Sequence, residues 1–172
     1  MKTCPVCKYS DSLPFITVNK FTVVKCKNCD LAFTILHTRH DVNKYNTVHY
    51  AENYLAGYEN RKERLVKRFM VRLKDIERHK RGGNLLDVGC STGLFLRTVQ
   101  ENSIYQWKLF GIDINKNSIQ FAQTKVNASF FCFSLHKKKF KKGFFDCITC
   151  FDVLEHDVDI KGNLKEIHRI LK

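Results

Sequence analysis

The sequence predicts an α/β fold with a parallel sheet, preceded by a small metal-stabilised module. Two observations support this prediction. From residue 84 onward, apolar strand-like runs alternate with helix-like runs, a pattern typical of parallel sheets with crossover helices. Before residue 37, four of the eight cysteines form two C-x-x-C pairs. We therefore divide the chain into a module at 1–36, a tyrosine-rich connector with an amphipathic helix at 37–83, and a sheet domain at 84–172.

The composition is that of a globular protein. Hydrophobic residues make up 44% and charged residues 27% of the 172 residues, and the net charge is +13. No apolar run approaches the roughly 20 residues that span a bilayer, and the start of the chain has no apolar signal core, so we expect a cytoplasmic protein without a membrane span. The basic excess favours anionic partners such as nucleic acid or nucleotide-linked metabolites, although solubility alone accounts for it equally well.

The two amino-terminal cysteine pairs predict a zinc ribbon. Cys4 and Cys7 form one pair, and Cys26 and Cys29 form the second. Four thiolates complete tetrahedral zinc and leave no open position, so the metal would be structural. About 36 residues cannot build a sufficient core alone, which explains the need for metal. Short strands are expected at residues 21–25 and 31–33.

A third C-x-x-C pair has a different interpretation. Cys147 and Cys150 lie in an apolar strand-like run at residues 145–151. Residues three apart on a strand point to opposite faces, so these two thiols cannot bind one ion together. We interpret them, with Cys132, as small core residues.

The helical part of the connector spans residues 59–80. Its apolar residues recur at spacings of four, four and three, namely Leu65, Phe69, Leu73 and Ile76. The pair Gly82-Gly83 ends this helix.

A glycine-rich turn follows. Residues 85–88 read as a buried strand, Gly89 to Gly93 as a tight turn, and 94–99 as a helix, with Ser91 as its N-cap. Such a turn lets a ligand approach the free N–H groups of the helix start. The turn matches neither the dinucleotide fingerprint nor a P-loop, so a nucleotide ligand need not have a pyrophosphate.

The next strand, residues 108–114, contains the acid Asp113 near its end. An acid at this position commonly binds ribose hydroxyls. The alternative is that Asp113 only closes a turn or caps the helix expected at 115–125.

Four segments together resemble class I S-adenosylmethionine-dependent methyltransferases of the subgroup related to ubiquinone biosynthesis. The segments are 85–93, 111–113, 145–156 and 166–172. The resemblance implies a Rossmann-like doubly wound sheet, here incomplete with about four strands.

The resemblance also implies roles for individual residues. The methionine end of the cofactor would be held by Asp87, Gly89, Cys90, Ser91 and Gly93, with Ser91 in place of the usual middle glycine. Asp113 would bind the ribose and Ile114 would pack on adenine, while Ser134 stands where many members have an acid near the adenine amine. Phe151 and Asp152 would flank the methionine moiety.

Glu155 and His156 would face the substrate. A histidine suits a general base because its ordinary pKa is about 6.5. The alternatives are that His156 packs or caps at the last helix, and that Glu155 either orients His156 or binds cofactor. The acceptor would be a small, anionic metabolite, such as a sugar or a nucleotide-linked intermediate. The lysine-rich run at 137–142 either clamps such an anion or is a solvated loop.

The last helix is predicted to bury one apolar stripe, which consists of Ile160, Leu164, Ile167 and Leu171. The resembled fold normally continues beyond this helix, so the fourth strand would form a sheet edge here. Its apolar character suits a central strand. We therefore expect a truncated product, a fragment, or a subunit whose sheet a partner chain completes. A non-catalytic remnant of the fold and an RNA methyltransferase are the alternative functions.

Overall fold

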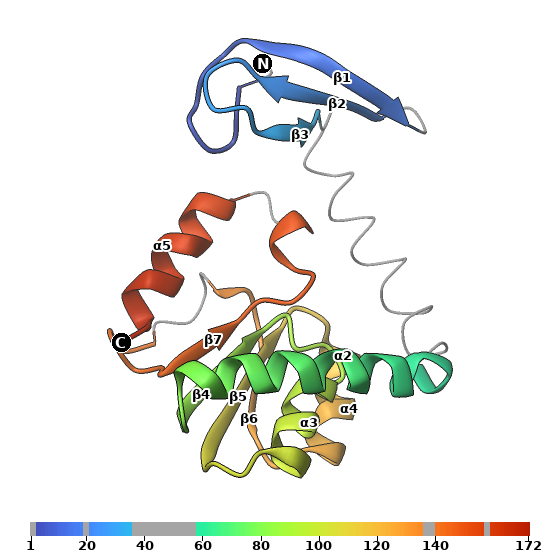
Figure 1. Cartoon of the computed structure of the whole chain (residues 1–172), viewed down its shortest axis with the longest axis vertical. Coiled ribbons are helices and arrows are strands. Elements are labelled where there is room, and N and C mark those ends of the chain that lie inside the picture. Colours follow the sequence, from blue (N-terminus) through green and yellow to red (C-terminus); the bar gives the residue numbers. More distant parts are fainter. Residues whose placement is uncertain (1–2, 19–20, 36–57, 136–139, 157–158) are drawn as a thin grey trace.

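The computed structural model describes residues 3–18, 21–35, 58–135, 140–156 and 159–172 (Figure 1). Most of the tyrosine-rich connector and half of the lysine-rich run lie outside these ranges. The described residues form two sheets, a three-stranded one in the amino-terminal module and a four-stranded one between residues 83 and 149. None of the helices in the described ranges is long and apolar enough to cross a membrane.

The amino-terminal module is an antiparallel sheet in the order β1-β2-β3. The strands are β1 (Ser12–Val18), β2 (Phe21–Cys26) and β3 (Ala32–Thr34). The two strands expected from the sequence correspond to β2 and β3, and β1 was not foreseen. The module buries few side chains, chiefly Cys4, Val24 and Cys26. A core this small needs a cross-link of another kind.

The second sheet is parallel throughout, with the order β6-β5-β4-β7. The strands are β4 (Gly83–Val88), β5 (Trp107–Asp113), β6 (Ser129–Cys132) and β7 (Cys147–Thr149). This arrangement confirms the predicted α/β class with about four strands. As expected, β7 is an edge strand within the part of the chain that the structure describes.

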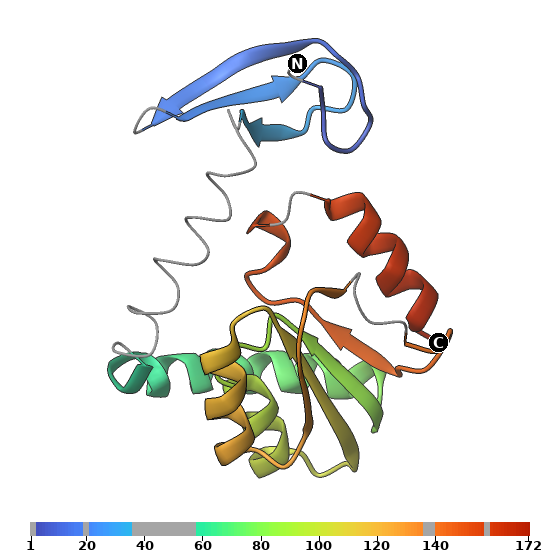
Figure 2. The same cartoon turned by 180° about the vertical axis from the view of Figure 1, so that it is seen from behind.

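Three helices pack against one side of this sheet (Figures 1 and 2). They are α2 (Tyr58–His79), α3 (Leu94–Asn102) and α4 (Lys116–Lys125). The predicted apolar positions Phe69, Leu73 and Ile76 join α2 to this core, and Leu73 is only 2% exposed. The division of the chain at residue 84 remains a prediction, and this packing favours grouping α2 with the sheet.

A second cluster covers the other face of the sheet. It contains Leu86 and Phe110 from the strands, Phe145, and Ile170 from α5 (Ile160–Ile170). The predicted stripe on this last helix was wrong in part. Ile170 is fully buried and Ile167 packs beside it, whereas Leu164 is 48% exposed and Leu171 follows the helix. The inward face therefore lies along Asn163, Ile167 and Ile170.

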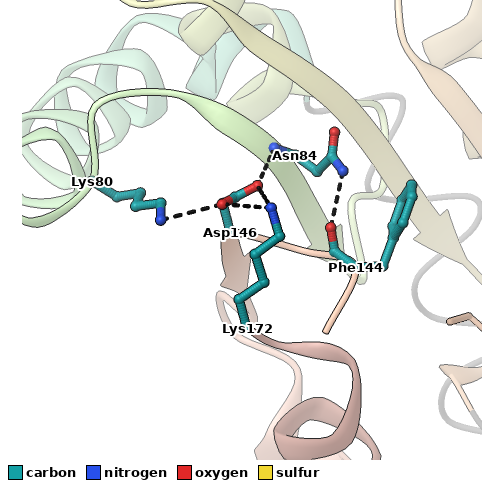
Figure 3. Close-up of polar contacts among 5 residues, drawn as sticks. All are labelled: Lys80, Asn84, Phe144, Asp146 and Lys172. Carbon is teal, nitrogen blue, oxygen red and sulfur yellow. Dashed lines mark hydrogen bonds and ion pairs between the residues drawn. The ribbon is translucent and has the colours of Figure 1, made fainter. Parts of the chain in front are cut away.

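A half-buried carboxylate joins three segments at the amino-terminal end of β4 (Figure 3). Asp146 Oδ2 accepts the backbone N–H of Asn84 at 2.9 Å and also pairs with Lys172 Nζ at 2.9 Å. Lys80 Nζ lies 3.2 Å from the other carboxylate oxygen, and the Asn84 side chain donates to the carbonyl of Phe144. The pKa of Asp146 is lowered to about 2. The hydrogen bond from the Asn84 N–H is the largest cause, and the contacts with Lys172 and Lys80 lower the pKa further.

Three cysteines outside the amino-terminal module were predicted to be core residues, and the structure confirms this interpretation for two of them. Cys147 packs against the first core cluster and Cys150 against the second, which confirms that they face opposite sides of the sheet. Cys132 is exposed, so its assignment to the core was wrong. It lies at the end of β6, which is the other edge strand, where only Phe130 of that strand is buried.

Candidate cofactor site

The carboxyl ends of all four parallel strands lie at one edge of the sheet, because parallel strands share a direction. The turn that begins at Gly89 follows β4, Asp113 ends β5, and the segment from Cys150 to His156 follows β7. Ligands of open α/β sheets bind at such an edge. The predicted cofactor residues therefore come together by topology.

The glycine-rich turn is fixed to the neighbouring strand. The backbone N–H groups of Gly89 and Cys90 both donate to the carbonyl of Ile112, at 2.8 and 3.0 Å. Gly89, Ser91 and Gly93 have positive φ angles of 71°, 47° and 73°. Four N–H groups of the turn are thus used within the fold, because the Ser91 N–H also donates to Asp113 and the Gly93 N–H donates to the Cys90 carbonyl.

The two glycines of the turn meet protein atoms. A Cβ on Gly89 would lie 2.3 Å from Val153 Cγ2, and one on Gly93 would lie 3.1 Å from Ala122 Cβ on α4. The missing side chains therefore allow the β7 loop and α4 to pack closely. Cys90 is 5% exposed and belongs to the first core cluster, so its side chain faces the core instead of a ligand. Any cofactor contact of Cys90 and Gly93 is through the backbone.

Ser91 has a different role from the predicted N-cap. The N-cap of α3 is Gly93, which makes no side-chain cap bond. The Ser91 hydroxyl is buried and has no hydrogen-bond partner among the described residues. Because a buried hydroxyl without a partner costs free energy, a polar ligand group at this position would be stabilising.

Asp113 lies directly beside the turn. Its Oδ2 accepts the Ser91 N–H at 2.8 Å, and its Oδ1 accepts the Asn115 N–H at 2.8 Å. A carboxylate has about four acceptor positions, so two remain for ligand hydroxyls. Burial raises the pKa of Asp113, and these backbone donors oppose the rise. The cap of α4 is Asn115, whose side chain accepts the Ser118 N–H. Asp113 thus closes a turn and still has free acceptor capacity.

Asp87 lies beneath the turn. It is 4% exposed, and its Oδ1 accepts the Thr149 hydroxyl of β7 at 2.7 Å. Burial raises the pKa of Asp87 to about 7, and the Thr149 bond opposes this rise. Thr149 was not foreseen as a residue of this site. Its partnership depends on the pairing of Asp87 with Thr149 in neighbouring strands, which no local pattern reveals.

Ile114 and Ser134 follow the ends of β5 and β6. The side chain of Ile114 is 64% exposed although it is large and apolar. Ser134 is half-buried. An exposed isoleucine beside Asp113 offers a surface for a flat ring, as the resemblance implies.

The segment after β7 contains the remaining predicted residues. Phe151 packs in an aromatic cluster, with ring centroids 5.0 Å from Phe95 and 5.9 Å from Phe69. Asp152 is exposed, has a φ angle of 54°, and lies 3.6 Å from Arg68. The contributions of Phe69 and Arg68 from α2 were not foreseen as part of the site, although the spacing of Phe69 had placed it in the core.

Glu155 and His156 lie in the short 3-10 helix η2 (Leu154–His156). Glu155 is exposed and His156 is half-buried, with its backbone N–H donating to the Val153 carbonyl at 3.0 Å. Because Val153 also packs over Gly89, the structure holds this pair beside the glycine turn.

The four amino-terminal thiols form a second candidate site. The Sγ atoms of Cys4, Cys7, Cys26 and Cys29 all lie within 4.8 Å of one another. Cys4 and Cys26 are buried, and Cys29 is exposed. Four sulfur atoms at these separations can surround one tetrahedral ion.

The two cysteine loops also share one backbone conformation. Lys8 N–H donates to the carbonyl of Cys4, and Asp30 N–H donates to that of Cys26, each at 3.1 Å. Lys8 and Asp30 both have left-handed φ angles, 65° and 59°. A backbone hydrogen bond from Tyr9 lowers the pKa of the Cys7 thiol to about 6. Two like loops that face each other bring four thiols together as ligands of one ion.

The sheet order and the turn after β4 define an α/β protein whose candidate cofactor site lies at the carboxyl ends of its strands. The chain belongs to the methyltransferase domain family, which matches residues 54–172. The sequence-based assignment to class I S-adenosylmethionine-dependent methyltransferases is thereby confirmed.

Relatives agree with this assignment. The chain is 32% identical over 117 residues to the ubiquinone/menaquinone biosynthesis C-methyltransferase UbiE of Geotalea uraniireducens, covering 64% of this chain and 48% of that protein. It is 29% identical over 109 residues to a ubiquinone biosynthesis O-methyltransferase of Coxiella burnetii, with coverages of 59% and 45%. The chain thus spans about half the length of these curated relatives.

Solved structures share the fold. The plantazolicin methyltransferase BpumL, in complex with SAH, superposes with a TM-score of 0.61 at 18% identity, covering 76% of this chain and 52% of that one. The YcgJ protein of Bacillus subtilis gives a TM-score of 0.53 at 23% identity, with coverages of 60% and 45%.

Proposed function

We propose that this chain binds S-adenosylmethionine and contains the cofactor half of a methyltransferase site. The main support is the Ser91–Asp113 pair, in which a buried hydroxyl without a partner and a carboxylate with spare acceptor capacity meet at the glycine turn. A ligand with ribose hydroxyls and a polar amino-acid end satisfies both groups.

Each cofactor moiety has candidate partners in the described chain. Asp113 accepts the ribose hydroxyls, and Ile114 packs on adenine with Ser134 nearby. The Ser91 hydroxyl and the turn from Gly89 to Gly93 hold the methionine end. When bound, the cofactor supplies an electrophilic methyl group on a sulfonium.

Two further parts of the chain would enclose the methionine end of the cofactor. The buried Asp87 lies beneath the turn, where a bound ammonium group would stabilise its ionised form, and Phe151 with Asp152 forms the side wall. The aromatic cluster around Phe151 excludes water from this wall, because its rings pack edge to face with Phe95.

His156 and Glu155 form the acceptor side. In one interpretation His156 removes the acceptor proton, and in the other it only packs at the start of the last helix. A bell-shaped or sigmoidal pH profile that His156→Gln abolishes supports the base. Glu155→Gln separates its two interpretations, because an orienting carboxylate changes that profile whereas a cofactor ligand changes cofactor affinity.

The acceptor that we propose is a small anionic metabolite. We place the protein in the cytoplasm, where a reducing environment keeps its thiols free. Completion of the sheet by a further strand, on the same or a partner chain, would cover the edge at β7.

We further propose that Cys4, Cys7, Cys26 and Cys29 bind one structural zinc ion. The support is the compact set of four sulfur atoms and the two like cysteine loops. The metal would replace the core that this module lacks.

Calorimetric titration with S-adenosylmethionine and S-adenosylhomocysteine tests the cofactor proposal. Ser91→Ala should weaken binding about fivefold to tenfold, since it removes one hydrogen bond of about 1–1.5 kcal/mol. Ser129→Ala, at an exposed serine of β6, is the matched control. A folded chain that binds neither ligand contradicts the proposal.

A further inference from the structure

A hollow of about 380 Å³ lies between the first cysteine loop and the helix α5. It is lined by Val6, Ile160, Lys161, Leu164, Lys165 and His168. Figures 1 and 2 both show the amino-terminal module facing the first half of this helix. The volume falls in the range of small-molecule sites, about 300–1,000 Å³.

One half of the hollow is basic. Lys161, Lys165 and His168 lie at spacings of four and three, so they occupy one face of α5. None of their side chains forms an ion pair or hydrogen bond with another described residue. Glu166 pairs with Arg169 at 2.6 Å and does not line the hollow. Like charges on one helix face repel each other, and a bound anion would remove this repulsion.

The other half is apolar. Val6 and Leu164 are 44% and 48% exposed, and Ile160 is half-buried. Leu164 is the residue of the predicted apolar stripe of α5 that the structure leaves exposed instead of buried. A ligand with both an anionic group and a hydrocarbon part would match the two halves.

We propose that this hollow binds an organic phosphate, and that the phosphate is the anionic end of the methyl acceptor. A phosphomonoester has up to two negative charges, which two lysines and a histidine can balance. The helix α5, which forms most of the hollow, begins four residues after His156 in the chain. The second statement rests on the proposed methyltransferase function, whereas binding of the phosphate does not.

The test uses the full chain and phenyl phosphate as the probe, titrated by calorimetry at low salt. Inorganic phosphate and phenol separate the contributions of the charge and the ring, and phenyl phosphate should bind more tightly than either. Changing Lys161 and Lys165 together to Gln should weaken binding at least tenfold, because two charge-assisted contacts are lost. Lys74→Gln, at an exposed position of α2, should leave it unchanged.

A second pair of variants tests the contribution of the amino-terminal module. Val6→Asp places a negative charge at the wall of the hollow and should reduce phenyl phosphate binding about tenfold. Val18→Asp is its matched control, since Val18 on β1 is similarly exposed, at 50% against 44% for Val6, but does not line the hollow. Equal effects of the two changes would contradict a site shared by the module and α5.

Two other results would overturn the proposal. One is phenyl phosphate binding that is unaffected by the double lysine change. The other is lysine-dependent binding of a thymidine oligonucleotide without binding of phenyl phosphate, which would indicate a nucleic-acid surface. S-adenosylhomocysteine is titrated into every variant in parallel. If phenyl phosphate binds and S-adenosylhomocysteine does not, the cofactor proposal fails and the phosphate site stands. If S-adenosylhomocysteine binds and phenyl phosphate does not, the phosphate site fails and the cofactor proposal stands.

Discussion

The backbone N–H of Ser91 donates to the carboxylate of Asp113 at 2.8 Å, and this bond joins the turn after β4 to the end of β5. It follows from the register of the two strands, in which Val88 lies opposite Ile112. Beyond this pair, the turn after β4 and the last residue of β5 both lie at the carboxyl edge of the sheet, where Ser91 and Asp113 meet. The carboxylate is therefore held in place before a ligand arrives, which reduces the entropy lost on binding.

Changing Asp113 should affect the cofactor more than the fold. We expect Asp113→Ala to weaken S-adenosylmethionine binding roughly tenfold to a hundredfold, since charge-assisted hydrogen bonds contribute about 1.5–3 kcal/mol. Calorimetry on the variant, with Asp75→Ala on α2 as the control, measures this loss. Undiminished affinity in a folded Asp113→Ala variant would exclude Asp113 as the ribose ligand.

Gly89 tests the packing of the β7 loop on the turn. Gly89→Ala should destabilise the fold by about 2–4 kcal/mol, because its Cβ would overlap Val153 and its φ angle is left-handed. Adding Val153→Ala should recover the part that is due to overlap. Urea unfolding of both single variants and the double variant measures the coupling. Strictly additive effects would show that Val153 does not limit the space at Gly89.

Metal analysis tests the four-thiol site. Protein from zinc-replete expression should contain close to one zinc per chain, and Cys26→Ser should lose it because three thiolates hold zinc poorly. Cys132→Ser changes an exposed thiol outside the cluster and should keep the metal. The helical signal of the α/β part should persist in Cys26→Ser. A wild-type protein without zinc contradicts the assignment.

Asp146 should stabilise the fold in a pH-dependent way. Its pKa is lowered to about 2 in the folded chain, so its contribution is complete above the ordinary carboxyl pKa near 4 and is lost as the pH falls towards 2. Asp146→Asn should cost about 1–2 kcal/mol at pH 7 and less at pH 2.5. Urea unfolding at both pH values measures this difference, with Asp75→Asn as an exposed control. A loss that does not vary with pH would argue against the charge.

The contribution of Asp87 to stability should change with pH in the opposite direction to that of Asp146. Because burial raises its pKa to about 7, the folded chain holds a proton that the unfolded chain has released, and stability contributed at this site falls as the pH rises from about 4 to 7. Asp87→Asn should flatten this decline. A bound cationic amino group would ionise Asp87, so cofactor binding near pH 6 should release protons. Titrations in buffers of different ionisation enthalpy detect this release, and no buffer dependence would contradict it.

The sequence by itself determined the alternation of strands and helices from residue 84 onward and the position of the glycine-rich turn. It also identified the candidate metal ligands and the candidate cofactor residues. These features depend on spacing along the chain. Gly89 to Gly93 lie within one turn, and each cysteine pair lies within one loop, so local patterns suffice to find them.

The tertiary structure decided which of these side chains are available to a ligand. Cys90 and Gly93 are in the turn that the sequence identified, yet both pack against the core because β5, β6 and α4 lie beneath them. Thr149 meets Asp87 only because β7 pairs with β4, although the two residues are far apart in sequence. Leu164 is exposed because the inward face of α5 is set by the cluster around Phe145. Burial and partnership depend on which elements become neighbours, and the spacing of residues within one element does not contain that information.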